Sequence, residues 1–392
     1  MSSRNWVLTA ALLALGMKLW VTAVTVGTND AESFYNFGRF IWEHGLLAQY
    51  RATPEFNHTP LTGWFCAAAY GIAGGMGFNW LLRAPGILAD FCSVLVFLRW
   101  RDAKGSPPWW LLALYALSPV SLMVSGYHGN VDSVMTFLLL LAARECCDDR
   151  AMASGLWLGL ACNVKVIPLL VAPVLFFFWL ARGRAREFSL PAAICILAGW
   201  AVPLIAIPRL FLSQVLGYGS NWGSWGLSCI LRFTGAKCFD PVGFTGLTSA
   251  QVVIMSILKV GIIALALWIA WRRRILPGEA MFSTLAFVWA AFFVLAPGVG
   301  AQYLVWIAPF LLLDSARWYA AVTFASGIFL AIFYQTISHE WPWHRGISTA
   351  ELVPAWAGWS LVPWLTIAVY LIARRGEMPG TARIESRSEG SG

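Results

Sequence analysis

The segment His128-Gly-Asn-Val-Asp132 places an imidazole, an amide and a carboxylate within five residues, between two apolar runs. Gly126 and Gly129 give the backbone freedom to turn there and let a ligand approach closely. Loops between apolar runs are polar in any case, but this does not explain a carboxylate in so short a corner. We therefore predict that His128, Asn130 and Asp132 bind substrate.

Lys165 is the second residue whose type and position indicate chemistry. It follows the apolar run Gly155–Val164 and lies at the outer mouth of two adjoining apolar segments. An ammonium within a bilayer is costly and commonly marks a functional site. The alternative is a lysine that extends its charge to the outer interface. Asp90 is weaker as a candidate, because an internal pair with Arg83 or Lys18 would explain it structurally.

The composition determines which elements must position these residues. Of 392 residues, 59% are hydrophobic and only 12% are charged, about half the charged share of a soluble protein. A soluble fold could not bury so much apolar surface, so we predict an all-α, polytopic membrane protein. We expect twelve membrane helices, near residues 5–27, 81–100, 107–126, 131–146, 151–165, 166–181, 189–208, 250–271, 279–296, 302–314, 317–337 and 356–374.

The net charge of +8 lies in short clusters between the apolar runs. These clusters are Arg99, Arg101 and Lys104; Arg182, Arg184 and Arg186; Arg272, Arg273 and Arg274; Arg374 and Arg375. This distribution is typical of cytoplasmic loops and does not indicate a nucleic-acid partner. The clusters all fall inside only if residues 59–78 do not cross, so we predict that this run is re-entrant or interfacial. Both termini are then cytoplasmic.

We expect one transmembrane domain over residues 1–375, followed by a disordered cytoplasmic tail over 376–392 that is rich in Gly, Ser and charge. Its larger exterior loops are residues 28–80, with interfacial helices, and residues 209–250. Cys229 and Cys238 share the second loop, and both a disulfide and two free thiols are open for them.

Three ordered stretches resemble the C-type glycosyltransferases that use polyprenyl-phosphate sugars. The first is Asn29-Asp-Ala-Glu-Ser-Phe-Tyr, followed by His58-Thr-Pro-Leu-Thr-Gly-Trp64. The corner His128-Gly-Asn-Val-Asp-Ser133 and the run Asn163-Val-Lys-Val-Ile-Pro168 are the other two. The resemblance is closest to the family that adds the first mannose to glycosylphosphatidylinositol anchors. The later half matches only loosely, through Trp225-Gly226 and Gln302-Tyr303.

The resemblance implies an inverting transfer of a hexose, with mannose favoured, from a polyprenyl-phosphate carrier to a hydroxyl of a lipid or glycan acceptor on the non-cytoplasmic face. The family's first exterior loop carries Asp-x-Asp, whereas this chain reads Thr28-Asn29-Asp30 there. Asp30 is therefore the expected general base, and Asp30-x-Glu32 in a shifted register is the alternative. We assign no metal ligands, and participation of a divalent cation stays open.

Substrate binding also requires cations where charge develops on the leaving phosphate. We expect Lys165 to be the first of these. The full set of predicted substrate-binding residues is Glu32, His58, His128, Asn130, Asp132, Lys165, Arg232 and Arg345.

The rival function is a transporter or flippase of a lipid-linked sugar or small solute, because intramembrane charges also mark transport pathways. Against it, the two halves show no internal repeat, and the ionisable residues gather at one face and not at the midplane. A non-catalytic scaffold would not need carboxylates in short corners. The sequence contains neither a Walker A nor a Rossmann motif, which argues against a nucleotide-sugar donor.

Overall fold

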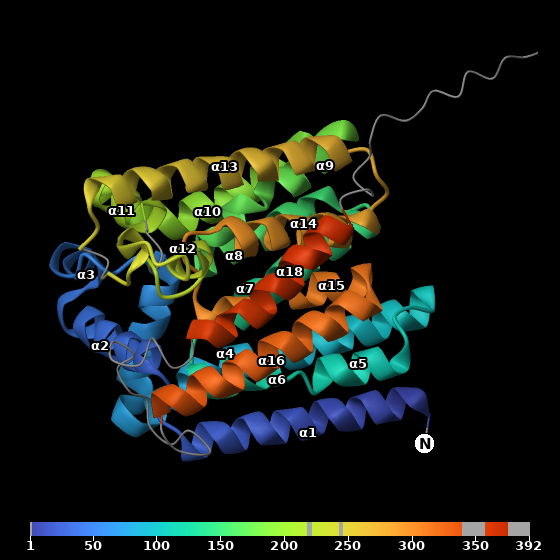
Figure 1. Ribbon diagram of the computed structural model, residues 1–392, viewed down its shortest axis with the longest axis horizontal. Helices are drawn as coiled ribbons and strands as arrows, with labels where there is room; N and C mark the ends of the chain where they lie inside the picture. Colours follow the sequence, from blue (N-terminus) through green and yellow to red (C-terminus); the bar gives the residue numbers. More distant parts are fainter. Residues whose placement is uncertain (1, 218–221, 243–245, 339–356, 375–392) are drawn as a thin grey trace, which may run out of the picture.

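The computed structural model describes residues 2–217, 222–242, 246–338 and 357–374 (Figure 1). Within these ranges all regular structure is helical and no strand is present, as the composition predicted. The helices are α1 (Ser3–Val24), α2 (Asn29–His44), α3 (Leu46–Ala52), α4 (Pro60–Lys104), α5 (Trp109–Ala116), α6 (Pro119–Ser121), η1 (Leu122–His128), α7 (Asp132–Cys147), α8 (Ala151–Val164), η2 (Ile167–Leu170), α9 (Ala172–Ala181), α10 (Ala185–Ala206), α11 (Pro208–Leu216), α12 (Leu227–Arg232), η3 (Lys237–Phe239), α13 (Ser249–Arg273), α14 (Ala280–Leu295), η4 (Ala301–Val305), α15 (Ala308–Asp314), α16 (Ala316–Ser338), η5 (Gly358–Ser360) and α18 (Leu361–Ala373).

Six helical stretches of the described residues are long and apolar enough to cross a membrane, which makes the chain an integral membrane protein. They are Ser3–Val24, Gly77–Lys104, Trp109–His128, Ala185–Ala206, Ser249–Arg273 and Ala316–Ser338. Shorter apolar helices occupy most of the other positions where we expected spans. The total of twelve crossings stays a prediction.

The helix α4 is interrupted at Gly74, whose φ of 59° and ψ of −154° lie outside the helical region. Glycine adopts this conformation without the steric cost that a Cβ would impose. The part before the break packs on α2 and exposes Leu61, Trp64 and Ile72, while the part from Gly77 onward is a candidate span. The chain thus breaks within the run 59–78; that this run stays on one side of the bilayer remains a prediction.

The bundle has two chemically different ends (Figure 1). The helix α1 runs from the N-terminal end of the bundle to the end where α2 and α3 lie. Contacts at the N-terminal end join Arg4 to Asp102, Lys104 to Glu279, Arg182 to the Leu276 carbonyl, and Arg184 to Asp149. These basic residues therefore share the end opposite α2, which the positive-inside rule makes the expected cytoplasmic end.

A cysteine reporter at the basic end tests this topology. Gly105 has a left-handed φ of 73°, where a cysteine would be strained, whereas Ala103 is an exposed helical residue beside it. In a Cys238→Ser background, Ala103→Cys should react with an impermeant maleimide only after the cells are permeabilised. The exposed native Cys238, on the opposite side in our topology, should react in intact cells and is the positive control. Labelling of Ala103→Cys in intact cells would overturn the topology.

Inside the membrane, Asp90 pairs with Lys18 and not with Arg83. The distance from Lys18 Nζ to Asp90 Oδ2 is 2.6 Å, and Ser121 Oγ contacts both groups. Each of two buried charges is thus compensated by its partner. The pair belongs to the packing of α1 against α4 and α6, as the structural alternative for Asp90 predicted.

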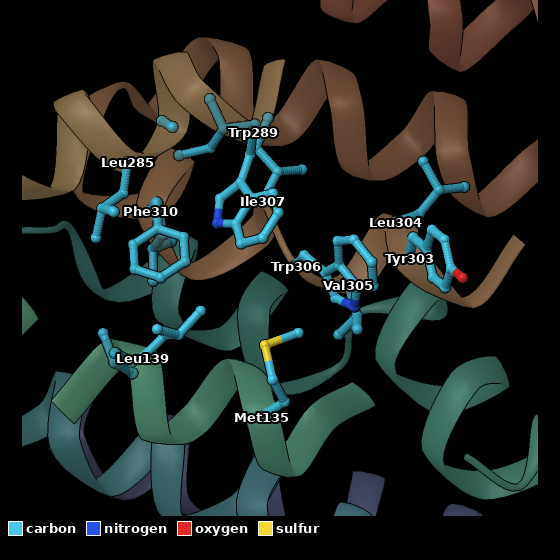
Figure 2. Packing of buried hydrophobic residues seen from close by; sticks show 14 of the residues in the cluster. Met135, Leu139, Leu285, Trp289, Tyr303, Leu304, Val305, Trp306, Ile307 and Phe310 are labelled. Carbon is cyan, nitrogen blue, oxygen red and sulfur yellow. The ribbon is translucent and has the colours of Figure 1, made fainter. Parts of the chain in front are cut away.

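One part of the hydrophobic core is built from α7, α14, η4 and α15 (Figure 2). Met135 and Leu139 of α7 lie against this group, and the indole rings of Trp289 and Trp306 are 5.1 Å apart. Trp306 is only 1% exposed. Dense aromatic packing leaves such a side chain little freedom, so the indole N–H of Trp306 has a defined direction toward α7.

Candidate active site

Asp30 lies in the first turn of α2, at the non-basic end of the bundle. Thr28 is the N-cap of this helix, and its hydroxyl accepts a hydrogen bond from the Asp30 backbone N–H. The same hydroxyl donates to the carbonyl of His128, at 3.0 Å. Thr28 therefore ties the start of α2 to the corner 128–132, and the N-terminal end of the helix dipole favours a negative charge at Asp30.

One oxygen of the Asp30 carboxylate receives three hydrogen bonds. Its Oδ2 lies 3.0 Å from His128 Nε2, 2.7 Å from Asn130 Nδ2 and 3.2 Å from Gln302 Nε2. Among the described residues no donor is recorded on Oδ1, and the side chain is 32% exposed. Three donors on one oxygen hold the carboxylate in a single orientation and leave the other oxygen available to a ligand.

The surroundings of Asp30 favour its ionised form. Burial by itself would raise the pKa of the carboxyl group, but the charge of His128, hydrogen bonds from His128 and Asn130, and the charge of Lys165 outweigh this effect. The pKa falls from 3.8 to about 2. Asp30 is therefore a carboxylate at any physiological pH.

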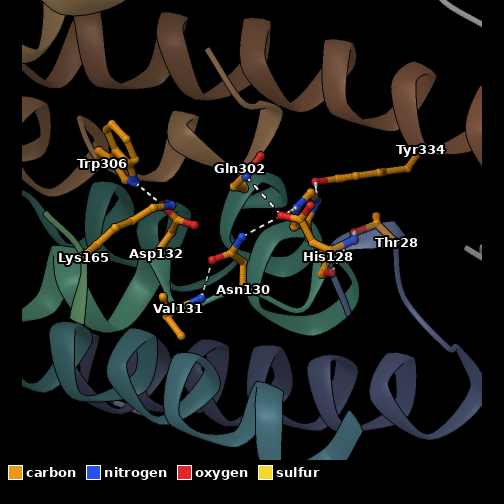
Figure 3. A network of polar contacts seen from close by, with 10 residues as sticks. Thr28, His128, Asn130, Val131, Asp132, Lys165, Gln302, Trp306 and Tyr334 are labelled. Atoms are coloured by element: carbon orange, nitrogen blue, oxygen red, sulfur yellow. Dashed lines mark hydrogen bonds and ion pairs between the residues drawn. The ribbon is translucent and has the colours of Figure 1, made fainter. Parts of the chain in front are cut away.

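His128 connects Asp30 to α16. It ends the π-helix η1 and is 5% exposed. Its Nδ1 lies 2.8 Å from the hydroxyl of Tyr334 (Figure 3). The next residue, Gly129, has a φ of 78°, which only glycine adopts readily.

The residues that contact Asp30 and His128 form a first polar cluster. Lys165 and Asp132 form a second polar cluster beside it (Figure 3). The distance from Lys165 Nζ to Asp132 Oδ1 is 2.8 Å, and the indole N–H of Trp306 donates to the same oxygen at 2.6 Å. The Lys165 ammonium also lies over the rings of Tyr303 and Trp306, 4.7 and 5.4 Å from their centroids. The Lys165 side chain is 15% exposed, whereas that of Asp132 is 0% exposed. The Lys165 side chain is thus partly accessible, whereas Asp132 is enclosed and turned toward Lys165.

His58 lies near both clusters. Its ring contacts those of Phe34, Phe37 and Phe56. Burial lowers the pKa of His58 to about 4; the positive charge of Lys165 contributes in the same direction and the negative charge of Asp30 opposes it. His58 is therefore a neutral hydrogen-bonding group at physiological pH.

The other predicted residues do not join the described clusters. Glu32 lies on the exposed face of α2, about 200° around the helix axis from Asp30. Arg232 ends α12 and lies over the ring of Phe233 at 5.9 Å. Arg345 lies outside the described residues. Cys229 and Cys238 are both free thiols, one buried and one exposed.

The sequence analysis did not predict Gln302 and Tyr334 of the first cluster, nor Trp306 of the second, as site residues. Gln302 was noted only as part of a loose match, and Tyr334 lies in a long apolar run without any distinguishing neighbour. A polar side chain at an exterior helix end was a usable signal for Gln302. No local signal existed for Tyr334, because apolar membrane helices carry tyrosines for many reasons.

The described residues do not fit a resident metal ion. No group of three or more His, Cys, Asp or Glu side chains in this part of the chain is arranged as a metal site. In addition, Oδ2 of Asp30 faces three N–H donors, and Glu32, the second carboxylate of the shifted register, lies on the exposed face of α2. We therefore derive no catalytic step through a metal.

Comparison with known proteins identifies the family of this chain. The model of Glycosyltransferase family 87 matches residues 79–298, which is more than half of the chain. GPI mannosyltransferase 1 of Kluyveromyces lactis is 22% identical over 248 residues, which are 58% of this chain and 58% of that protein. The alignment thus spans under two thirds of the relative's length. Lys165 and the corner 128–132 fall within the family match, and the chain belongs to glycosyltransferase family 87.

Proposed function

We propose that the enzyme transfers a hexose, mannose in the first instance, from a polyprenyl-phosphate carrier to an acceptor hydroxyl, with inversion at the anomeric carbon. The observation that carries this proposal is the Asp30 carboxylate, ionised, oriented by three donors and open at one oxygen, beside the ammonium of Lys165. A base and a cation side by side suit an attack by a hydroxyl and the departure of a phosphate. The mannosyltransferase name of the relative supports the choice of sugar.

Asp30 is the base in this mechanism. The acceptor hydroxyl approaches Oδ1, and its oxygen forms a bond to the anomeric carbon while its proton passes to the carboxylate. A carboxyl group with a pKa of about 2 is a weak base toward a free alcohol. The proton therefore moves late, when the new C–O bond has made the hydroxyl strongly acidic.

Lys165 stabilises the leaving group. The bond between the anomeric carbon and the phosphate oxygen breaks, its electron pair stays on that oxygen, and polyprenyl phosphate leaves. One N–H of the ammonium is directed to Asp132, which leaves the others for the phosphate. Asp132 then acts as a positioning residue for Lys165, although the sequence assigned it to substrate binding. His58 and Asn130 remain candidates for contacts with sugar hydroxyls.

The donor and the membrane-bound acceptor also explain where the site lies. The clusters occupy the end of the bundle opposite the basic residues, so the positive-inside rule directs them to the non-cytoplasmic face. A lipid-linked phosphate lies at the level of the headgroups, which is also the level of helix ends such as Asp30 and Lys165. The acceptor would be a lipid or glycan that presents its hydroxyl at this face.

The decisive experiment supplies purified enzyme in liposomes with radiolabelled polyprenyl-phosphate mannose and a lipid extract of the producing cells as acceptor. Matched reactions contain the glucose and arabinose analogues, and nucleotide-activated mannose. We expect a labelled glycolipid or glycan from the polyprenyl-phosphate mannose alone. Transfer from nucleotide-activated mannose would contradict the donor class. Movement of the intact donor across the bilayer without a covalent product would favour the flippase.

A further inference from the structure

Tyr334 and Asp30 contact opposite nitrogens of the same imidazole. The Tyr334 hydroxyl is 2.8 Å from His128 Nδ1, and Asp30 Oδ2 is 3.0 Å from His128 Nε2. Tyr334 comes from α16, while Asp30 comes from α2. A neutral imidazole carries one N–H and one lone pair, so the partner of one nitrogen constrains the state of the other.

The charge of Asp30 decides the direction of these hydrogen bonds. An ionised carboxylate only accepts, so Nε2 must carry the proton. In the neutral ring Nδ1 then has the lone pair and accepts from the Tyr334 O–H, whereas in the charged ring Nδ1–H donates to the Tyr334 oxygen. A ring flip about Cβ–Cγ would place carbon atoms at both positions and lose both hydrogen bonds. We propose that Tyr334 is a positioning residue that holds His128 in the Nε2–H tautomer and in this ring orientation, so that His128 supports the base Asp30.

The packing around Tyr334 leaves the phenol little freedom. Tyr334 is 0% exposed, and its ring meets that of Tyr127 edge-on, with 5.1 Å between the centroids. The backbone of His128 is held by Thr28 and by the turn at Gly129. The imidazole thus rotates only if it gives up the Tyr334 contact. Because His128 is itself buried, loss of this contact would leave Nδ1 without its donor.

The inference rests on the proposed role of Asp30 and is tested first with Tyr334→Phe. We expect kcat to fall about 10-fold, the scale of one neutral hydrogen bond, with KM for the donor unchanged because the phosphate is bound at Lys165. Tyr319→Phe is the matched control: Tyr319 is also fully buried on α16, about four turns away. It should keep the wild-type rate. A wild-type kcat for Tyr334→Phe would overturn the proposal.

A double-mutant cycle separates positioning from packing. In His128→Gln the amide nitrogen reaches the place of Nε2, but the side chain has no tautomers and no Nδ1. Tyr334→Phe should therefore cost almost nothing further in the His128→Gln background. A second, independent loss of about 10-fold there would mean that Tyr334 acts through packing alone.

His128→Asn tests the same idea without altering Tyr334. The shorter amide imitates Nδ1 and does not reach Asp30, so it should be at least about 10-fold slower than His128→Gln. Equal rates for the two variants would contradict the role of Nε2. Asp30→Asn, measured beside them, distinguishes the failures. If it is inactive while Tyr334→Phe is normal, only the present inference fails; if it is active, the proposed role of Asp30 as the base fails.

Discussion

Replacing Asp30 by asparagine should lower turnover by roughly 10²–10⁴-fold, the range for removal of a general base. The amide oxygen of Asn can take the place of Oδ2 and accept from His128, Asn130 and Gln302. The amide nitrogen then occupies the place of Oδ1, where it donates to the acceptor hydroxyl and cannot take its proton. Binding of the donor should survive, because Lys165 is unchanged. The measurement is the initial rate of sugar transfer together with the affinity for the donor lipid.

The control for Asp30→Asn is Glu43→Gln, which removes an exposed carboxylate from the same helix and should keep the wild-type rate. Glu32→Gln tests the shifted register. If Asp30→Asn is active while Glu32→Gln or Asp132→Asn is inactive, the base is assigned to the wrong carboxylate. If all three variants transfer sugar at the wild-type rate, the proposed glycosyl-transfer mechanism is wrong.

Lys165→Met should lower turnover by at least about 10²-fold, the scale of removing one preorganised charge donor. Methionine keeps the length and apolar contacts of the lysine chain but has no charge for the leaving phosphate. It also leaves the fully buried carboxylate of Asp132 without its cation. Removing one partner of a buried ion pair lowers the free energy of unfolding by several kcal/mol. Low expression of the single variant would therefore not identify the role of Lys165.

The double variant Lys165→Met, Asp132→Asn separates the two effects. With the buried charge removed, thermal stability in detergent should return toward that of the wild type, while turnover stays low. Transfer near the wild-type rate in the single variant would return Lys165 to the class of lysines that only extend to the interface. Recovery of both stability and activity in the double variant would make the pair purely structural.

The sequence by itself determined the class of the protein and the end of the bundle at which to look. Apolar runs of membrane length require helices, because a bilayer leaves no other way to satisfy the backbone. Since successive helix ends alternate between two faces, Asp30, His128 and Lys165 could be assigned to one face from the basic clusters at the other. The corner 128–132 and Lys165 could be selected because polar groups between apolar runs require an explanation.

Only the tertiary structure decided which of these groups meet. Gln302 and Asp30 are 272 positions apart and share a hydrogen bond, and Tyr334 reaches His128 from a helix that looks featureless in sequence. Asp132, the last residue of the corner 128–132, turns to Lys165 and not to Asp30. The pattern of apolar residues shows that a segment is a membrane helix, but hydrophobicity is non-directional. It specifies neither which helices become neighbours nor how each rotates about its axis, and these two choices are made by close packing of the whole bundle.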